Sequence, residues 1–74
     1  MPKFFTINVI VDDFEVESEK DDYSEESYKE HCKLIENIFK NEIDYLSFVT
    51  PQGKVFIPGE LLKKSIITLR TYDK

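Results

Sequence analysis

The sequence predicts an α+β fold: a mostly antiparallel sheet of about four strands, in β-α-β-β-β order, with one long helix packed on one face. Three observations predict this fold: an alternating apolar segment near the start, a helical apolar stripe in the middle, and a Pro-Gly turn between two β-rich segments. A chain of 74 residues can hardly divide its core. We therefore expect one acidic domain over residues 1–74.

The first strand is predicted over residues 4–11, which are rich in Phe, Ile and Val. Alternation places Phe5, Ile7, Val9 and Val11 on one face of this strand. The next apolar residues, Phe14 and Val16, have even numbers, so the parity of the pattern changes. A turn or bulge is therefore expected at residues 12–13.

A helix is predicted from about residue 25 to residue 40. Ser24 is a suitable N-cap, and Tyr23 can pack on Tyr28 as a hydrophobic staple. Asn41 is a suitable residue to end the helix. The expected apolar stripe consists of Tyr28, Cys32, Ile35 and Phe39, widened by His31, Leu34 and Ile38.

The last third of the chain predicts a hairpin and a final strand. Thr50, Pro51, Gln52 and Gly53 have the composition of a tight turn between strands at residues 45–50 and 54–57. A short helical turn is expected at residues 60–64. The β-branched residues that follow favour a last strand over residues 65–72.

Charge is distributed unevenly along the chain. Residues 1–30 hold ten acidic residues against three lysines, whereas residues 31–74 are slightly basic. The ten acids are Asp12, Asp13, Glu15, Glu17, Glu19, Asp21, Asp22, Glu25, Glu26 and Glu30. Such a face repels nucleic acid and anionic lipid and attracts basic surfaces. We therefore expect a basic protein partner, with neither direct nucleic-acid binding nor membrane binding.

The sequence offers little for catalysis. His31 is the only histidine, and its neighbour Cys32 points about 100° away on a helix, so the two cannot form a close catalytic pair. Gly53 and Gly59 are the only glycines, which excludes a glycine-rich phosphate loop. A calcium loop that begins at Asp13 would have serines where glycine and the closing glutamate belong. We therefore expect no enzymatic activity, no cofactor and no metal site.

The compartment follows from cysteine usage and hydropathy. Cys32 is the only cysteine, so no intramolecular disulfide can form. The N-terminal apolar segment lacks the pattern of a signal peptide, and no apolar run approaches the roughly 20 residues needed to span a bilayer. We expect a cytoplasmic protein.

The acidic segment can be interpreted as a binding surface. In an extended chain, Asp13, Glu15, Glu17 and Glu19 would lie on one side about 6.6 Å apart, a spacing similar to that of successive phosphates along one DNA strand. Phe14 and Tyr23 are candidate apolar anchors within this acidic surface. The ten acids together with these two aromatic residues form the predicted partner-binding site.

In its size, net negative charge and acid-dense segment, the chain resembles the acidic DNA-mimic inhibitors that bacteriophages direct against host DNA-binding proteins. The resemblance is compositional, covers about a quarter of the chain and includes no motif match. It implies a non-enzymatic inhibitor or regulator that occupies the basic DNA-binding surface of a protein such as the nucleoid protein HU. It also implies activity in the cytoplasm of a host cell, if the protein is phage-encoded.

Three other interpretations remain open at this point. The acidic segment can be a solvated loop that only keeps the protein soluble. The strand at residues 65–72 can pair with a second copy, which would make a structural or assembly module or a homodimer. A minimal nucleic-acid-binding domain could use a basic cluster beside two aromatic residues, namely Lys54, Lys63, Lys64 and Arg70 with Phe56 and Tyr72.

Overall fold

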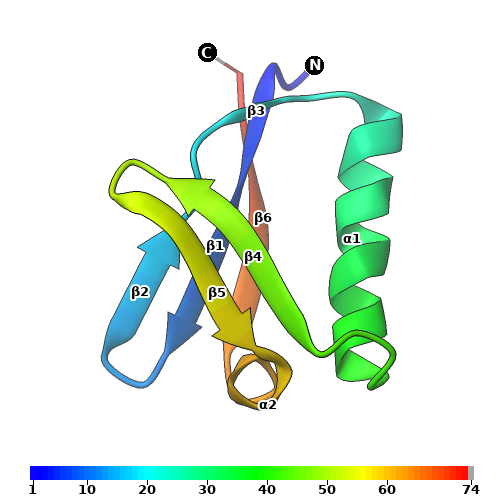
Figure 1. Cartoon of the computed structure of the whole chain (residues 1–74). Coiled ribbons are helices and arrows are strands. Elements are labelled where there is room, and N and C mark those ends of the chain that lie inside the picture. Colours follow the sequence, from blue (N-terminus) through cyan, green and yellow to red (C-terminus); the bar gives the residue numbers. More distant parts are fainter. Residues whose placement is uncertain (74) are drawn as a thin grey trace.

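The computed structural model describes residues 1–73 and has the α+β fold that the sequence predicts (Figure 1). The elements are β1 (Phe4–Val11), β2 (Phe14–Glu17), β3 (Asp21–Asp22), α1 (Glu25–Phe39), β4 (Tyr45–Thr50), β5 (Gly53–Pro58), α2 (Gly59–Leu62) and β6 (Ile66–Tyr72). The predicted bounds of the first strand are confirmed, and the predicted helix ends within one residue of the observed one.

Strand β1 is the centre of a four-stranded antiparallel sheet. It pairs with β2 and β3 along one edge and with β6 along the other. Its odd-numbered residues, Phe5, Ile7, Val9 and Val11, are all buried, as the alternation predicts. The parity change is explained by a tight turn at Asp12 and Asp13, in which Asp12 adopts a φ of 52°.

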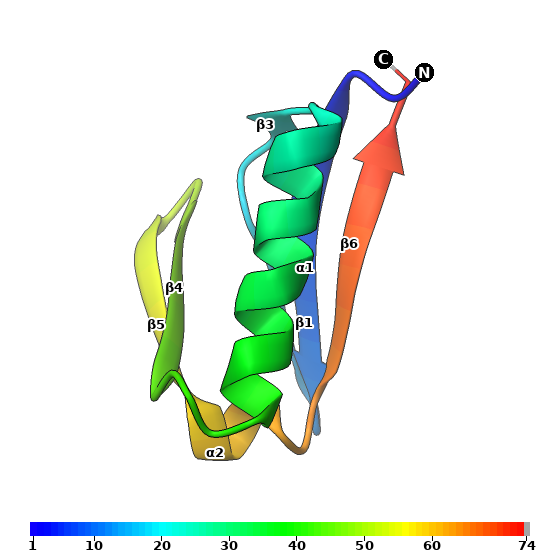
Figure 2. The ribbon, with the colours of Figure 1, turned by 90° about the vertical axis from the view of Figure 1, so that its right-hand side faces the viewer.

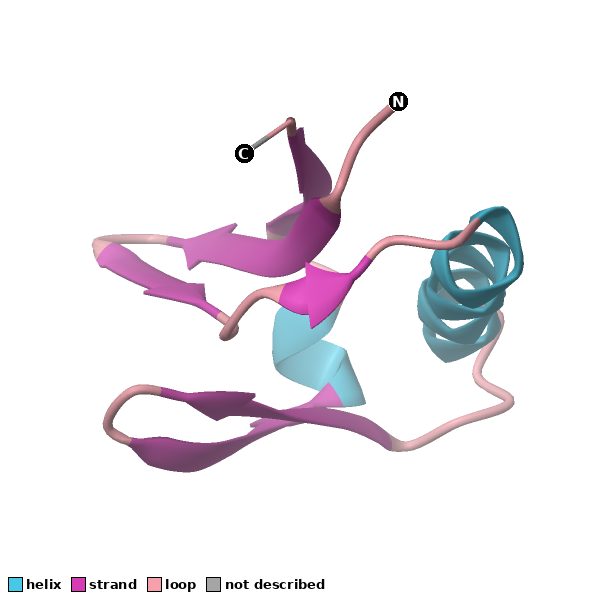
Figure 3. Cartoon of the chain, turned by 90° about the horizontal axis from the view of Figure 1, so that it is seen from above, coloured by secondary structure: helices cyan, strands magenta, loops and turns pink. Residues whose placement is uncertain are grey.

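The hairpin of β4 and β5 is confirmed, but it does not join the sheet of β1 and β6. It forms a separate two-stranded sheet, and β2 and β3 complete the four-stranded sheet instead. Figure 3 shows the two sheets as separate layers, with α2 between them and α1 along one side. Leu46, Phe48 and Ile57 of the hairpin are buried in one core with Ile7 and Val9 of β1, so the two sheets bury each other's apolar faces.

Helix α1 begins and ends as the sequence predicts. The Ser24 hydroxyl accepts a hydrogen bond from the Ser27 amide at 3.1 Å, and the rings of Tyr23 and Tyr28 lie 5.5 Å apart. Asn41 has a φ of 66°, and the next amide, that of Glu42, donates to the Asn37 carbonyl at 2.9 Å. This left-handed residue and backward hydrogen bond form a Schellman-type helix end.

The buried face of α1 differs from the predicted stripe. Ile38, expected only at its margin, is fully buried, whereas Phe39 is 43% exposed. The helix runs beside β1 and next to the β4–β5 hairpin (Figure 2), so its buried face is set by two sheets and not by one. Of the helices within residues 1–73, none is long and apolar enough to cross a membrane.

Candidate functional site: the acidic run

The ten predicted acids, here called the acidic run, follow one edge of the four-stranded sheet and continue onto the start of α1. The edge begins at the β1–β2 turn and passes through β2 and β3 (Figure 1). Nine of the ten are exposed, and Glu17 is half-buried. Within residues 1–73, only Glu15, Glu17 and Glu25 take part in ion pairs. The run is therefore mostly open to solvent, and seven of its ten acids have no ion-pair partner within residues 1–73.

A β-bulge divides the acidic run. Asn8 pairs with Glu17, and Phe5 pairs with Asp21. Between these two pairs β1 advances by three residues and the segment opposite it by four, so the opposite segment contains one extra residue. Ser18 holds the start of this bulge: its amide donates to the Ile7 carbonyl at 2.9 Å, and its hydroxyl accepts from the Ile7 amide at 2.8 Å. The extra residue reverses which side of the sheet later side chains face.

The expected row of four carboxylates is therefore wrong. Glu15 and Glu17 lie opposite Ile10 and Asn8 and share the outer face of the sheet, the face away from the hairpin. After the bulge, Glu19 has left the strand, and its amide donates to the Val49 carbonyl of the hairpin at 2.9 Å. The sequence could not show this, because the bulge depends on how Ser18 bonds to β1.

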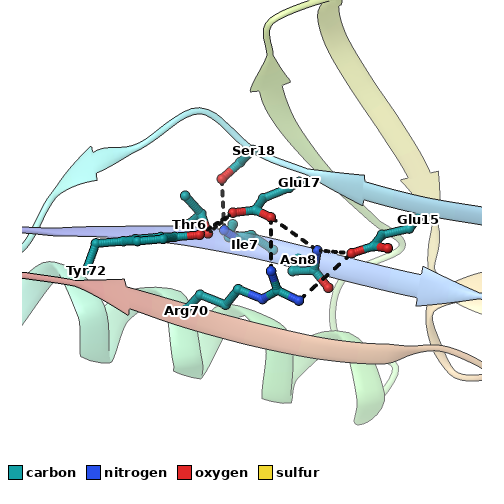
Figure 4. A network of polar contacts seen from close by, with 8 residues as sticks. All are labelled: Thr6, Ile7, Asn8, Glu15, Glu17, Ser18, Arg70 and Tyr72. Atoms are coloured by element: carbon teal, nitrogen blue, oxygen red, sulfur yellow. Dashed lines mark hydrogen bonds and ion pairs between the residues drawn. The ribbon is translucent and has the colours of Figure 1, made fainter. Parts of the chain in front are cut away.

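Glu17 is the best-anchored acid of the run. Its Oε2 accepts hydrogen bonds from the Tyr72 hydroxyl at 2.6 Å and from the Thr6 hydroxyl at 2.8 Å (Figure 4). These two bonds, first that of Tyr72, lower the pKa of Glu17 from its ordinary value, with smaller contributions from Arg70 and Asn8. Partial burial acts in the opposite direction but does not prevail. Glu17 is therefore held as a carboxylate in a fixed orientation.

Asn8 and Arg70 join Glu15 to the same cluster. The Asn8 side-chain amide donates to Glu15 at 3.0 Å and to Glu17 at 3.4 Å. The Arg70 guanidinium lies 3.4 Å from Glu17 and 3.9 Å from Glu15. We call this cluster the outer-face network; its members are Thr6, Asn8, Glu15, Glu17, Arg70 and Tyr72 (Figure 4).

The two predicted aromatic anchors differ in accessibility. Phe14 is 55% exposed and lines a shallow, mainly apolar hollow with Val11, Leu61 and the two aspartates of the turn. Tyr23 is half-buried, and its ring packs edge-on against Phe5 at 6.3 Å. Phe14 is therefore accessible at the surface, whereas the Tyr23 ring lies between Phe5 of β1 and Tyr28 of α1.

The acids of α1 are all exposed to solvent. Glu25 pairs with Lys29 one helical turn later at 3.1 Å, with both side chains more than 70% exposed. Such exposed pairs contribute little, because water and salt screen them. Glu26 and Glu30 are also exposed and form no ion pair within residues 1–73.

His31 and Cys32, the residues considered for catalysis, lie on α1. The His31 ring packs edge-on against Phe5 at 5.0 Å, and its Nδ1 donates to the Ser27 carbonyl at 2.8 Å. Cys32 is half-buried. Within residues 1–73, no group of three His, Cys, Asp or Glu side chains is arranged to hold a metal ion.

The predicted basic cluster is divided between the two sheets and the end of α2, where Lys63 and Lys64 lie. Lys54 lies over the Phe56 ring on the hairpin, at 5.4 Å from its centroid. Arg70 and Tyr72 belong to β6 of the other sheet and contact Glu17. These residues do not form one basic surface beside two aromatic rings.

Sequence reasoning missed the partners of Glu15 and Glu17. Thr6 and Asn8, the polar residues of β1, are only 2% and 1% exposed, although alternation places them on the face away from the core. One available signal was the isolated Asn8 in the middle of an apolar strand, because strand interiors rarely use Asn without a side-chain partner. The pairing with Arg70 had no local signal, since 53 residues separate it from Glu17.

The chain matches no protein-family model, no curated protein and no solved structure.

Proposed function

We propose that the chain is a non-enzymatic protein-binding module that occupies the basic, DNA-binding surface of a nucleic-acid-binding protein, as a DNA-mimic inhibitor or regulator. The single observation that carries this proposal is the acidic run: ten carboxylates along one sheet edge and the helix start, nine of them exposed and seven without an ion pair within residues 1–73. The target can be a nucleoid protein such as HU. The site of action is the cytoplasm.

The backbone that carries these acids supports the proposal. Strands β2 and β3, which carry four of the ten acids, are both hydrogen-bonded to the central strand β1, and helix α1 carries three more, so seven of the ten lie on regular secondary structure and not on a free loop. An ordered acidic surface loses less conformational entropy on binding than a flexible one. A basic groove could exchange its contacts with phosphates for contacts with these carboxylates.

Phe14 supplies the apolar component of the proposed interface. It is exposed at the end of the acidic run, with Leu61 and the turn aspartates Asp12 and Asp13 around the same hollow. Protein interfaces concentrate binding energy in such partly buried anchors surrounded by polar residues. Specific attachment would then combine charge attraction with insertion of Phe14.

Capture from bacterial lysate followed by competition tests the proposal. The immobilised chain should retain a basic protein that an excess of duplex DNA releases. Retention should fail with Asp12→Lys, Asp21→Lys and Asp22→Lys combined, because these exposed acids belong to the run. The matched control combines Glu36→Lys, Glu42→Lys and Glu60→Lys, which changes the net charge equally outside the run.

Two results would count against DNA mimicry. One is a retained partner that duplex DNA does not displace, since mimicry requires a shared surface. The other is equal loss of retention in the control variant, which would reduce the interaction to nonspecific charge attraction.

One observation favours a second candidate, a structural or assembly module that forms homo-oligomers. Strand β6 has seven residues and, within residues 1–73, pairs with β1 alone, so its other edge is open. Ile66 at its start is 67% exposed. Open strand edges readily pair with another chain. Sedimentation equilibrium tests this: a dimer that Ile66→Glu dissociates would support it, and a monomer at high concentration would remove it.

A further inference from the structure

The outer-face network contains acceptor oxygens that receive weak hydrogen bonds or none from the donors within it. Oε2 of Glu17 is held by two short bonds, from Tyr72 at 2.6 Å and Thr6 at 2.8 Å. Within residues 1–73, the other oxygen, Oε1, has only two long contacts, both at 3.4 Å, to Asn8 and Arg70. The strong bonds thus fix the direction of Oε1 without satisfying it.

Asn8 adds a second acceptor that has no donor. It is only 1% exposed, and its amide nitrogen donates to both glutamates, which fixes the side chain within the network. Its Oδ1 is buried and accepts no hydrogen bond within residues 1–73. Buried carbonyl oxygens without a donor are uncommon and unfavourable, because they have lost water without gaining a partner. This oxygen indicates that a further donor belongs in the network.

Arg70 occupies the network only loosely. Its two contacts with Glu17 and Glu15 measure 3.4 and 3.9 Å, and its side chain is 45% exposed. Charge-assisted bonds between a guanidinium and a carboxylate are typically about 2.7–2.9 Å long. Figure 4 shows the Arg70 head group next to Asn8 and facing both glutamates. An exposed side chain with such long contacts can swing into solvent at little cost.

We infer that this part of the outer face is a receptor for an arginine side chain of the partner, which enters in place of Arg70. The incoming guanidinium lies between Glu15 and Glu17 and offers its remaining N–H groups to Oδ1 of Asn8. Arg70 is then an internal competitor that covers the receptor in the free protein. This inference rests on the proposed function, since it names the partner group that the acidic run receives.

The geometry favours a guanidinium over an ammonium group. Two carboxylates and an amide oxygen place acceptors at separate points around the Arg70 head group, and a guanidinium presents five donors that point in different directions from one rigid group. An ammonium is a compact charge with three donors and a stronger hold on its water. DNA-binding surfaces use arginine widely against phosphate oxygens, which the two glutamates would replace.

Titration of the ¹⁵N-labelled full chain with an acetylated, amidated Gly-Arg-Gly peptide tests the inference by NMR. The side-chain amide signals of Asn8 should shift, because its amide borders the receptor. Arg70→Ala should bind this peptide about three- to tenfold more tightly, since a site that is covered part of the time binds with reduced apparent affinity. Lys64→Ala is the matched control: it removes one positive charge from an exposed residue outside the network and should change affinity much less.

Two further samples complete the experiment. Glu15→Gln should weaken peptide binding, whereas Glu60→Gln, an equal charge change on α2, should not. A Gly-Lys-Gly peptide should bind more weakly than the arginine peptide to every form of the protein. Amide spectra and thermal unfolding of each variant verify that the fold is retained.

The inference is overturned if Arg70→Ala and Lys64→Ala bind the peptide equally, if the Asn8 signals do not move, or if the lysine peptide binds as well as the arginine peptide. None of these outcomes contradicts the proposed function, provided that duplex DNA still displaces the partner captured from lysate. Conversely, arginine-specific binding without a DNA-displaced partner would retain the receptor and reject mimicry.

Discussion

Among single residues, Glu17 joins three strands of the sheet through one side chain. Its carboxylate accepts bonds from Thr6 on β1 and from Tyr72 on β6, and it belongs to β2. Three strands are therefore connected on their outer face by one side chain. The same bonds hold its pKa below the ordinary value of 4.5, the Tyr72 hydroxyl having the largest effect. The acid thus serves stability as well as any binding role.

Glu17→Gln should lower the free energy of unfolding by about 1–2 kcal/mol at neutral pH, because hydrogen bonds to a charged acceptor are replaced by weaker ones. The pKa of Glu17 is lower in the folded chain than in the unfolded chain, so its contribution is present above about pH 4.5 and is lost as pH falls through the folded pKa. Urea unfolding at pH 7 and at pH 3 measures both effects. The difference from wild type should shrink at pH 3, and Glu60→Gln is the exposed control.

Among the elements, α1 has the clearest sequence signals for its two ends, and yet its buried face depends on the elements that pack around it. Ser24 and Asn41 define its two ends, and both act through hydrogen bonds within a few residues. Ile38, in contrast, is buried only because the hairpin and β1 meet there. Local residues therefore determine where the helix begins and ends, whereas packing selects which side is buried.

Ser24→Ala should destabilise the chain by about 1 kcal/mol, because the Ser27 amide loses its acceptor at the helix start. Ser24→Asp should retain most of the stability, since a carboxylate can also cap the helix. Thermal unfolding followed by circular dichroism measures both variants. Equal losses in the alanine and aspartate variants would mean that the cap contributes nothing.

At the scale of the whole molecule, charge is concentrated at one edge. The formal net charge is −5, while residues 1–30 alone carry ten acids against three lysines. Carboxylates that are brought together on an ordered edge repel one another, which opposes folding. The same arrangement raises the rate of encounter with a basic partner. Stability is therefore reduced by the feature on which the proposed function depends.

Added salt should raise the thermal midpoint, because it screens repulsion within the acidic run over about 8–10 Å at moderate ionic strength. The increase between 20 and 500 mM sodium chloride should be smaller in a variant that combines Asp12→Asn, Asp21→Asn and Asp22→Asn. Differential scanning fluorimetry measures both midpoints. An equal increase in the two proteins would show that the run does not repel itself in the folded state.

Much of the fold could be predicted from short-range patterns. The alternation of β1, the N-cap at Ser24, the Asn41 helix end and the hairpin around Gly53 each depend on residues close together in the chain. For the candidate site, the ten acids and Phe14 could be selected from composition and spacing, and all of them except the half-buried Glu17 are exposed. Their relative placement could not be predicted, since it required knowing which strands pair with β1.

The sequence by itself determined the α+β class, the bounds of the main helix and first strand, and the concentration of acids before residue 31. The tertiary structure alone decided that the hairpin forms its own sheet, that a bulge at Ser18 divides the acidic run, and that Arg70 meets Glu15 and Glu17. The physical reason is separation along the chain. Strand periodicity and caps are local, whereas the sheet register brings together residues as far apart as Glu17 and Tyr72 only when β1 pairs on both of its edges.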